Sequence, residues 1–272
     1  MVRSSLCKQY HMQLSDSEKN DEKVWYQKQS LKNIGSCRFS MGAFPKYLQK
    51  PYRIYETMIH RCGSLLPRPI QVLDLCCGMG EFTFRIAELI HGTVLGVDYS
   101  AESIQVAVRE LKKRQLSNLR FEVGDSEQCQ FKDEFFDMIC MSGSLSYLNL
   151  DVVLEKICRW LKPDGAFIAV DTYGYNPLFN LKRQLNYWFH YTTKQTVTGV
   201  PKKPTLDKIR SRFQSFEIEY CGTFAFMGPF LKYLIGEAYT AKWVDRLDDV
   251  FPFLKKYAFK FVFCAKGPKV QK

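Results

Sequence analysis

Short apolar runs alternate with amphipathic stretches along the middle of the chain. Apolar runs at residues 70–75, 93–97, 119–123, 135–141 and 166–170 predict buried strands, and amphipathic stretches at 82–90, 100–111 and 152–161 predict helices between them. Strands that alternate with helices are typical of a doubly wound α/β domain, whose sheet is mostly parallel and covered by helices on both faces. We therefore expect this architecture for the middle of the chain.

The pattern changes after residue 172. Residues 173–177 contain Gly and Pro and break regular structure, 178–191 are helical and aromatic, and 192–204 are polar and basic. We expect residues 172–212 to be an insertion that forms a helical lid over the substrate.

Two further strand-like runs, at 215–223 and 258–265, bring the predicted sheet to seven strands, with aromatic helices expected in 226–254 between them. The apolar side chains there include Phe230, Leu231, Tyr233, Leu234 and Ile235. Core packing is the role that we expect for them, and contact with a hydrophobic substrate or a lipid surface is the alternative.

Residues 1–45 are predicted to form a separate N-terminal segment, because the first forty residues are polar and mixed. This segment is expected to be partly disordered or to contribute Phe39–Tyr47 to a lid, and the α/β domain then spans 46–272. A helical period starts at Phe44 and is expected to end at Gly63.

Ten cysteines are scattered along the predicted strands and helices, with no Cys-x-x-Cys pair. This spacing predicts neither a disulfide framework nor a metal site, and it indicates a reducing compartment. The chain has no run of eighteen apolar residues and no signal-peptide pattern at its start. We therefore expect a cytoplasmic protein without a transmembrane segment.

The first predicted strand leads into a glycine turn, in the stretch Val72-Leu-Asp-Leu-Cys-Cys-Gly-Met-Gly-Glu-Phe-Thr83. Gly78 and Gly80 allow the backbone to approach a ligand closely, and the helix that follows offers unpaired N–H groups and the positive end of its dipole. A strand, a tight turn and a helix in this order predict a site for an anionic or strongly polar ligand.

Acidic residues follow the next two strands at set distances. Asp98 lies 18 residues after Gly80, at the end of the second strand, where a carboxylate can accept hydrogen bonds from both hydroxyls of a ribose. Asp125 and Ser126 follow the third strand and suit the exocyclic amine of adenine, although capping of a short helix would also explain them. Thr83 stands where a full Gly-x-Gly-x-x-Gly would have its last glycine, which disfavours a nicotinamide cofactor.

These signals together resemble the ordered motifs of class I S-adenosylmethionine-dependent methyltransferases. The motifs are Asp74 with Gly78 and Gly80, then Asp98, Asp125, Phe136-Asp-Met-Ile-Cys140 and Leu161-Lys-Pro-Asp-Gly165. The resemblance covers residues 70–171 and implies a Rossmann-like fold with S-adenosyl-L-methionine as cofactor. One departure is Cys76, which stands where the family's first motif usually has its first glycine, and we expect a tighter fit around the ligand there.

The resemblance, together with the strand ends, predicts the cofactor-binding residues: Asp74, Cys76, Gly78, Gly80, Asp98, Tyr99, Asp125, Ser126 and Ser142. Ser142 opens the loop 142–147 after the fourth strand, which should face the reactive end of the cofactor. This loop carries no Pro-Pro-aromatic motif of amino-methylating nucleic-acid enzymes and no paired glutamates for arginine methylation, and the chain has no Pro-Cys pair for cytosine C5 chemistry.

A hydroxyl acceptor would need a base, and the candidates near the expected ligand edge are His190, Asp171 and Tyr147, with Tyr173 as a further one. His190 lies in an aromatic stretch, so a surface or packing role is its alternative. Asp171 and Tyr147 could equally do no more than shape the pocket. The sequence thus predicts O-methylation of a small molecule, with a glycan or a lipid-linked precursor included.

The net charge of +11 is concentrated outside the cofactor motifs. Residues 172–212 alone hold eight basic side chains and one acidic side chain, which predicts an anionic substrate or simply a solvated basic surface. A tRNA or rRNA methyltransferase that uses this basic insertion is the second interpretation, although the loop 142–147 disfavours it. A cofactor-binding regulatory protein without activity is the third, and peripheral membrane contact stays open.

Overall fold

The computed structural model describes residues 44–67 and 69–269. The predicted N-terminal segment 1–45 therefore lies outside the described residues except for its last two positions, and so does most of the proposed lid stretch Phe39–Tyr47. Among the described residues, no helix is both long and apolar enough to cross a lipid bilayer.

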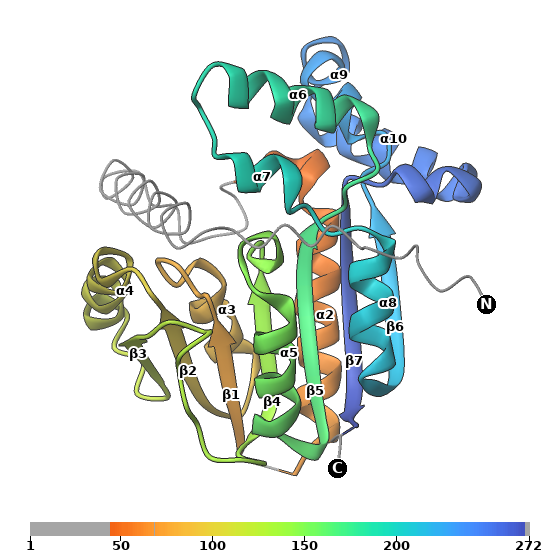
Figure 1. The fold of residues 1–272 in the computed structure, drawn as a ribbon. Helices are drawn as coiled ribbons and strands as arrows, with labels where there is room; N and C mark the ends of the chain where they lie inside the picture. Colours follow the sequence, from red (N-terminus) through yellow and green to blue (C-terminus); the bar gives the residue numbers. More distant parts are fainter. Residues whose placement is uncertain (1–43, 68, 270–272) are drawn as a thin grey trace, which may run out of the picture.

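One seven-stranded sheet forms the centre of the molecule (Figure 1). Its strands are β1 (Ile70–Leu75), β2 (Gly92–Asp98), β3 (Leu119–Val123), β4 (Phe136–Ser142), β5 (Leu161–Thr172), β6 (Phe213–Cys221) and β7 (Lys260–Pro268), in the spatial order β3-β2-β1-β4-β5-β7-β6. The first five are parallel, and β7 runs antiparallel to both β5 and β6. The predicted Rossmann-like, mostly parallel sheet of seven strands is confirmed.

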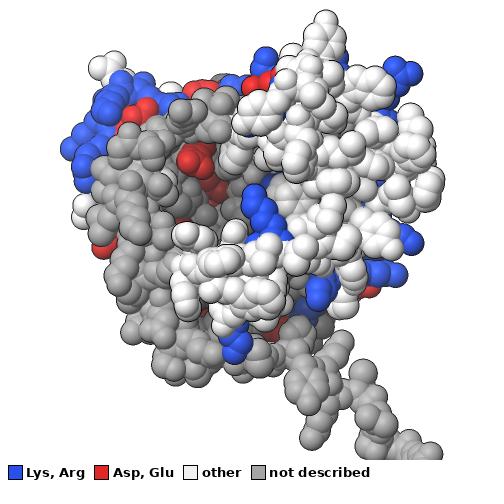
Figure 2. All heavy atoms as spheres, turned by 90° about the horizontal axis from the view of Figure 1, so that it is seen from above, with Lys and Arg blue, Asp and Glu red and all other residues white. Residues whose placement is uncertain are grey.

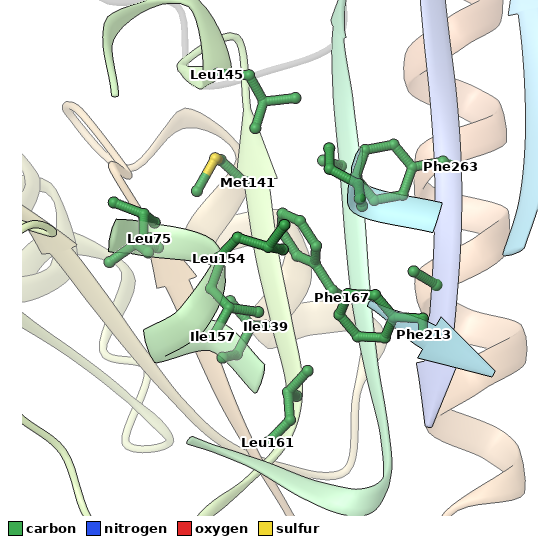
Figure 3. Packing of buried hydrophobic residues seen from close by; sticks show 14 of the residues in the cluster. Leu75, Ile139, Met141, Leu145, Leu154, Ile157, Leu161, Phe167, Phe213 and Phe263 are labelled. Carbon is green, nitrogen blue, oxygen red and sulfur yellow. The ribbon is translucent and has the colours of Figure 1, made fainter. Parts of the chain in front are cut away.

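Helices cover both faces of the sheet, as predicted. α2 (Lys50–Leu65) and α3 (Glu81–Leu89) pack on one face, while α5 (Leu150–Trp160) and α8 (Lys203–Ser211) pack on the other; α4 (Ala101–Arg114) lies next to β2 and β3. Alternate side chains of each central strand enter the two layers. In β4, Ile139 and Met141 face the layer that Figure 3 shows, and Met138 and Cys140 face the other. Burial on both faces explains why these strands are continuous apolar runs.

Two local predictions need correction. Gly63 does not end α2 but lies inside it, where a Cβ atom would come within 3.4 Å of Ile70 Cδ1, and the helix continues to Leu65. The turn expected at 162–165 is part of β5, although the pairing with β4 is irregular there, because the partner of Leu161 is Phe136 and that of Ala166 is Met138. Between these two pairs, β4 advances by two residues and β5 by five. The three extra residues of β5 lie within Lys162-Pro-Asp-Gly165 and form a bulge.

The remaining helices lie above the carboxyl ends of the strands in Figure 1: α6 (Pro177–Trp188), α7 (Lys194–Thr198), α9 (Gly228–Ile235) and α10 (Glu237–Val250). Short 3-10 turns are η2 (Lys46–Leu48), η3 (Leu145–Tyr147), η4 (Ala225–Met227) and η5 (Pro252–Tyr257). The expectation that the α9 side chains pack in the core is wrong for four of them, since Phe230, Tyr233, Leu234 and Ile235 are each exposed. Only Gly228 of α9 is buried, against the ring of Tyr47.

Candidate cofactor and acceptor site

The turn between β1 and α3 uses left-handed backbone at three positions. φ is +60° at Cys76, +56° at Gly78 and +83° at Gly80. Nothing lies within 4 Å of the place where a Cβ of Gly78 would stand, so this residue leaves open space for a ligand. A Cβ at Gly80 would come within 2.7 Å of the Phe121 ring, so this position needs glycine for packing as well as for conformation.

Cys76 occupies a backbone conformation that glycine adopts without strain, which accounts for the glycine expected here by the family pattern. Its thiol is desolvated, and burial raises the pKa of Cys76 far above its usual range. Burial also raises the pKa of the neighbouring Cys77. Both sulfurs are therefore neutral thiols that shape the site, because a nucleophilic cysteine needs a lowered pKa.

A cavity of about 440 Å³ opens at the carboxyl ends of β1, β2 and β4. Figure 2 shows its mouth as a hollow with acidic side chains on its wall. The lining residues used below are Phe44, Tyr52, Asp74, Cys76, Gly78, Glu81, Phe82, Asp98, Tyr99, Asp125, Ser126, Ser142, Tyr147 and Leu148. Of the nine residues predicted to bind the cofactor, eight line this cavity; Gly80 does not and supports the turn from behind.

Asp98 ties the glycine turn to the start of α4. One of its carboxylate oxygens accepts the N–H of Gly78 at 2.8 Å, and the other accepts the N–H of Ser100 at 2.9 Å. Each oxygen keeps a second lone-pair direction, so the carboxylate can still accept two hydrogen bonds from a diol. Burial raises the pKa of Asp98, while the two N–H donors oppose that shift. Ser100 caps α4 as predicted, because its hydroxyl accepts the N–H of Ser103.

Asp74 lies deeper, beneath the same turn. Its carboxylate accepts the hydroxyl of Thr83 at 2.6 Å. Burial raises the pKa of Asp74 to about 7, with a further increase from the charge of Asp98 and a decrease from the Thr83 hydrogen bond. Thr83, which departs from a dinucleotide glycine pattern, is therefore the residue that orients Asp74. A cation next to Asp74 would favour its ionised form.

The residues predicted for the adenine side lie at the cavity, but they cap no helix, because residues 126–128 form a turn. Asp125 lines the cavity, and its carboxylate also accepts the N–H of Glu127 at 2.9 Å, as in an Asx turn. Ser126 and Tyr99 also line the cavity. This hydrogen bond holds the Asp125 side chain at the cavity edge, which is compatible with the predicted binding role.

A stack of three aromatic rings forms another wall of the cavity. The rings of Phe44 and Tyr52 are 4.5 Å apart with 22° between their planes, and those of Tyr52 and Phe82 are 5.1 Å apart with 23°. Glu81 lies beside this wall, and burial raises the pKa of its carboxyl. Phe44 belongs to the stretch Phe39–Tyr47 that the sequence predicts as part of a lid, whereas Tyr52 and Phe82 were not among the predicted site residues.

The loop 142–147 is braced from β5. Asp171, buried at the end of that strand, accepts the N–H of Leu145 at 2.8 Å. Tyr147 lines the cavity, and its hydroxyl lies 3.1 Å from the Thr196 hydroxyl of α7. Burial raises the pKa of Asp171, and the charge of Lys260 opposes this shift.

The three candidate bases are not brought together. Tyr147 is in the cavity wall, Asp171 lies behind the loop, and His190 is exposed after the end of α6, with a φ of +58°. Neither Asp171 nor His190 belongs to the cavity lining. The geometry thus leaves Tyr147 as the one of the three that could touch an acceptor, and gives the other two no direct contact with the cavity.

Arg183 of α6 was not among the predicted site residues. Its guanidinium is directed inward, donates to Asn180, and experiences the negative charge of Asp171. Its Nη2 is buried without a hydrogen-bond partner among the described residues. Burial lowers the pKa of Arg183, although an arginine remains charged in proteins. With Lys260, whose ammonium lies 5.2 Å from the centre of the Tyr52 ring, it makes this end of the site positive.

The comparisons with known proteins agree on one family. A family model described as a methyltransferase domain matches residues 68–214, more than half of the chain. A demethylmenaquinone methyltransferase of Lactococcus lactis is 31% identical over 159 residues, which cover 56% of this chain and 60% of the relative. Another of that name, from Leptospira interrogans, is 35% identical over 108 residues, which cover 38% of this chain and 43% of the relative. The chain thus spans less than two thirds of these relatives.

Solved structures share the fold at low sequence identity. The geranyl diphosphate C-methyltransferase of Streptomyces coelicolor superposes with a TM-score of 0.61 at 15% identity, covering 94% of this chain and 100% of that one. The phosphoethanolamine N-methyltransferase 2 of Haemonchus contortus gives 0.58 at 18%, covering 79% and 52%. The cyclase SpnF gives 0.58 at 16%, covering 92% and 96%. Proteins with such different names share this fold, so the fold alone does not identify the acceptor, and the site itself must do so.

Proposed function

Because the chain belongs to the class I S-adenosylmethionine-dependent methyltransferases, we propose that its acceptor is a small amphiphilic molecule with a flat, hydroxylated ring. The observation that carries this proposal is the stack of Phe44, Tyr52 and Phe82 in the wall of the cofactor cavity. Parallel aromatic side chains favour a flat, apolar partner through offset stacking. The named relatives, which are demethylmenaquinone methyltransferases, act on a molecule of this general kind.

The residues present fit S-adenosyl-L-methionine. The cavity volume suits a ligand of that size, the open backbone at Gly78 admits close approach, and two buried carboxylates complement a cationic ligand. In our proposal Asp98 accepts the ribose hydroxyls, Asp125 and Ser126 take the adenine edge, and Asp74 with the Gly78 backbone holds the amino-acid end. When bound, the cofactor supplies a methyl group on a positively charged sulfur.

The chain's own contribution is to position and ionise the acceptor. Tyr52 and its neighbours would orient the ring, and their apolar wall would limit the access of water to the reacting atoms. Arg183 and Lys260 make the surroundings of Tyr147 positive, which lowers the pKa of an acceptor hydroxyl that lies there. An ionised ring hydroxyl carries negative charge on its oxygen and on the ring carbon ortho to the one that bears the oxygen. We therefore propose methylation at one of these two atoms, with oxygen as our first expectation.

The basic charge of residues 172–212 gives an RNA substrate no support. Lys208 forms an ion pair with Asp151, and the Arg210 guanidinium lies 5.4 Å from the centre of the Phe216 ring. Both belong to α8, which packs beside β6 on the face of the sheet (Figure 1). The charge of the segment is thus divided between α8 and the region above the cavity, instead of forming one continuous surface for a phosphate backbone.

The test is transfer from carbon-13-methyl-labelled cofactor to a panel of acceptors. The panel contains hydroxylated naphthoquinols and phenols with and without an isoprenoid tail, a free sugar, and ribosomal RNA. We expect labelled product only from the ring compounds, and the carbon chemical shift of the new methyl distinguishes an O-methyl from a C-methyl group. Asp133→Ala, an exposed substitution far from the cavity lining, should behave like the wild type. Label in the sugar or the RNA, with none in the rings, would contradict the proposal.

A further inference from the structure

Helix α6 presents most of its apolar side chains to solvent, and its inner side holds polar side chains together with Phe179. Leu178, Leu181, Leu185 and Trp188 recur at helical spacing and are all exposed. On the opposite side, Asn176 is buried, Asn180 donates to the carbonyl of Gly174, and the Arg183 guanidinium points inward. A surface helix of a soluble domain normally has the reverse orientation.

Helix α9 and the 3-10 turn η5 also expose apolar side chains. Phe230, Tyr233 and Leu234 recur at helical spacing on α9, and Tyr233 and Leu234 are 81% and 80% exposed. Phe253 of η5 is exposed too. Together with the four α6 side chains, these residues form what we term the cap face: Leu178, Leu181, Leu185, Trp188, Phe230, Tyr233, Leu234 and Phe253.

Contacts at the start of α6 join the three elements. The Asn176 side chain donates to the carbonyl of Tyr257 in η5 at 2.7 Å and to that of Thr223, just before η4 and α9, at 3.4 Å. Phe179 of α6 stacks on Phe259 at 3.8 Å and packs against the small apolar cluster that includes Val244 of α10. α6, α9 and η5 are therefore parts of one structure above the sheet, as Figure 1 shows.

Charge is distributed unequally around the cap face. Lys232, Lys242 and Lys256 lie over the rings of Tyr233, Tyr239 and Tyr257 at 4.8, 5.9 and 5.0 Å and form no ion pair within the described part of the chain. Figure 2, seen from above, shows a broad area of uncharged side chains beside the hollow, with Lys and Arg side chains at its edge.

The four acidic side chains of α10 contact other parts of the chain, although Glu237 and Asp249 remain exposed. Asp245 pairs with Arg53 and Asp249 with Lys50, both of α2. Asp248 accepts the N–H of Gly222, and Glu237 accepts that of Lys46. The surface thus combines exposed aromatic and aliphatic groups with unpaired lysines, whereas each carboxylate of α10 has a partner within the chain.

We propose that the cap face binds the surface of an anionic phospholipid bilayer, with α6 and α9 lying in the plane of the interface. Short helices with an apolar face, aromatic rings and lysines suit this location, because the rings enter the headgroup region and the lysines remain at the lipid phosphates. A second copy of the chain is less suited as the occupant, since a two-fold interface through this face would bring the lysine-rich edges of both copies together.

This orientation would bring the cavity close to the membrane. The polar side of α6, with Arg183, faces the site, while its apolar side faces the lipid. An amphiphilic acceptor could then present its head to the cavity and keep its tail in the bilayer. The membrane proposal itself does not depend on the acceptor, because it stands on side chains outside the cavity lining.

The experiment is co-sedimentation of the full chain with vesicles of phosphatidylcholine alone and of phosphatidylcholine mixed with phosphatidylglycerol. We compare wild type, Tyr233→Ser with Leu234→Ser, and Lys242→Glu with Lys256→Glu. The matched control is Leu65→Ser, because Leu65 is 73% exposed but ends α2 at the opposite end of the molecule (Figure 1). Cofactor binding by calorimetry verifies that each variant is folded.

We expect wild type and Leu65→Ser to sediment with the anionic vesicles. Removal of the two apolar side chains should lower this partitioning at least about tenfold, and the charge reversal should do so for anionic but not for neutral vesicles. Absence of vesicle binding by the wild type, or equal binding by all variants, would overturn the proposal. The wild type could instead fail to bind vesicles and form a dimer that Tyr233→Ser with Leu234→Ser dissociates. That result would assign the cap face to a second copy of the chain. Cofactor binding and transfer to a water-soluble ring are measured separately, so failure here leaves the proposed function standing.

Discussion

The cofactor side and the acceptor side of the cavity are built in different ways. On the cofactor side, Asp74, Gly78, Asp98 and Asp125 lie at or just after the carboxyl ends of β1, β2 and β3, and hydrogen bonds from the neighbouring turns fix the three carboxylates. The acceptor side is assembled from Phe44 before α2 and from α2, α3, the loop 142–147, α6 and β7, which lie far apart in the chain. The first side depends on local backbone geometry, whereas the second depends on how distant elements pack.

The largest loss of cofactor binding is expected from Asp98→Ala. This change removes the acceptor of the Gly78 and Ser100 N–H groups and the proposed partner of the ribose hydroxyls. We expect cofactor affinity to fall at least about 100-fold, since hydrogen bonds to charged groups are worth roughly 1.5 to 3 kcal/mol each. Isothermal titration calorimetry measures the effect, with Asp133→Ala as the control. Unchanged affinity would mean that Asp98 only shapes the turn.

Substitutions at the two glycines of the turn should separate effects on stability from effects on cofactor binding. Gly80→Ala combines a left-handed backbone with a clash against Phe121, so we expect the free energy of unfolding to fall by about 2 to 4 kcal/mol. Gly78→Ala meets no neighbouring atom, so its cost in stability should be only about 1 kcal/mol, while cofactor binding weakens more. Urea denaturation and calorimetry measure the two quantities. Equal stability losses at both positions would contradict this division.

The pH dependence of stability tests the electrostatics beneath the turn. Burial raises the pKa of Asp74 to about 7, so the folded chain binds this proton more tightly than the unfolded chain does. Stability of the cofactor-free protein should therefore fall as pH rises from about 4 to about 7, and Asp74→Asn should remove part of that fall. Urea denaturation across this range gives the slopes. Identical slopes in wild type and Asp74→Asn would show that this carboxyl titrates normally.

Smaller effects are expected on the acceptor side from single polar groups. Tyr147→Phe removes one hydroxyl from the cavity wall and should lower kcat by no more than about tenfold, because the positive surroundings remain. His190→Ala should leave kcat unchanged, since His190 is exposed and outside the cavity lining. Steady-state kinetics with the ring acceptor compares them. A larger loss in His190→Ala than in Tyr147→Phe would restore histidine as the base.

The same division explains what the sequence could predict. The motif spacing predicted the strands, the glycine turn and the position of Asp98 at the end of β2, because the periodicity within each βα unit determines where its strand, turn and helix lie. Thr83 was noted only as a departure from a glycine pattern, whereas its bond to Asp74 depends on the folded turn. The boundaries 1–45 and 172–212 and the roles of the individual site residues remain predictions.

The acceptor side could not be predicted from local patterns. Tyr52 has the helical spacing of a core residue. Its ring reaches the cavity only because α2 packs against β1 and α3. The apolar spacing of α6 and α9 identified helices correctly but gave no sign that their apolar sides face solvent. Periodicity indicates that one side of a helix is apolar, and tertiary packing decides where that side points.

The most direct test of the account measures cofactor Kd and acceptor KM separately in Tyr52→Ala and Asp98→Ala. The account predicts that Tyr52→Ala raises the acceptor KM at least about tenfold and leaves the cofactor Kd within about threefold, because the lost ring is part of the acceptor wall. Asp98→Ala should raise the cofactor Kd by the larger factor. If Tyr52→Ala weakens the cofactor as strongly as Asp98→Ala does, the aromatic wall belongs to the cofactor site, and the proposed acceptor site is wrong.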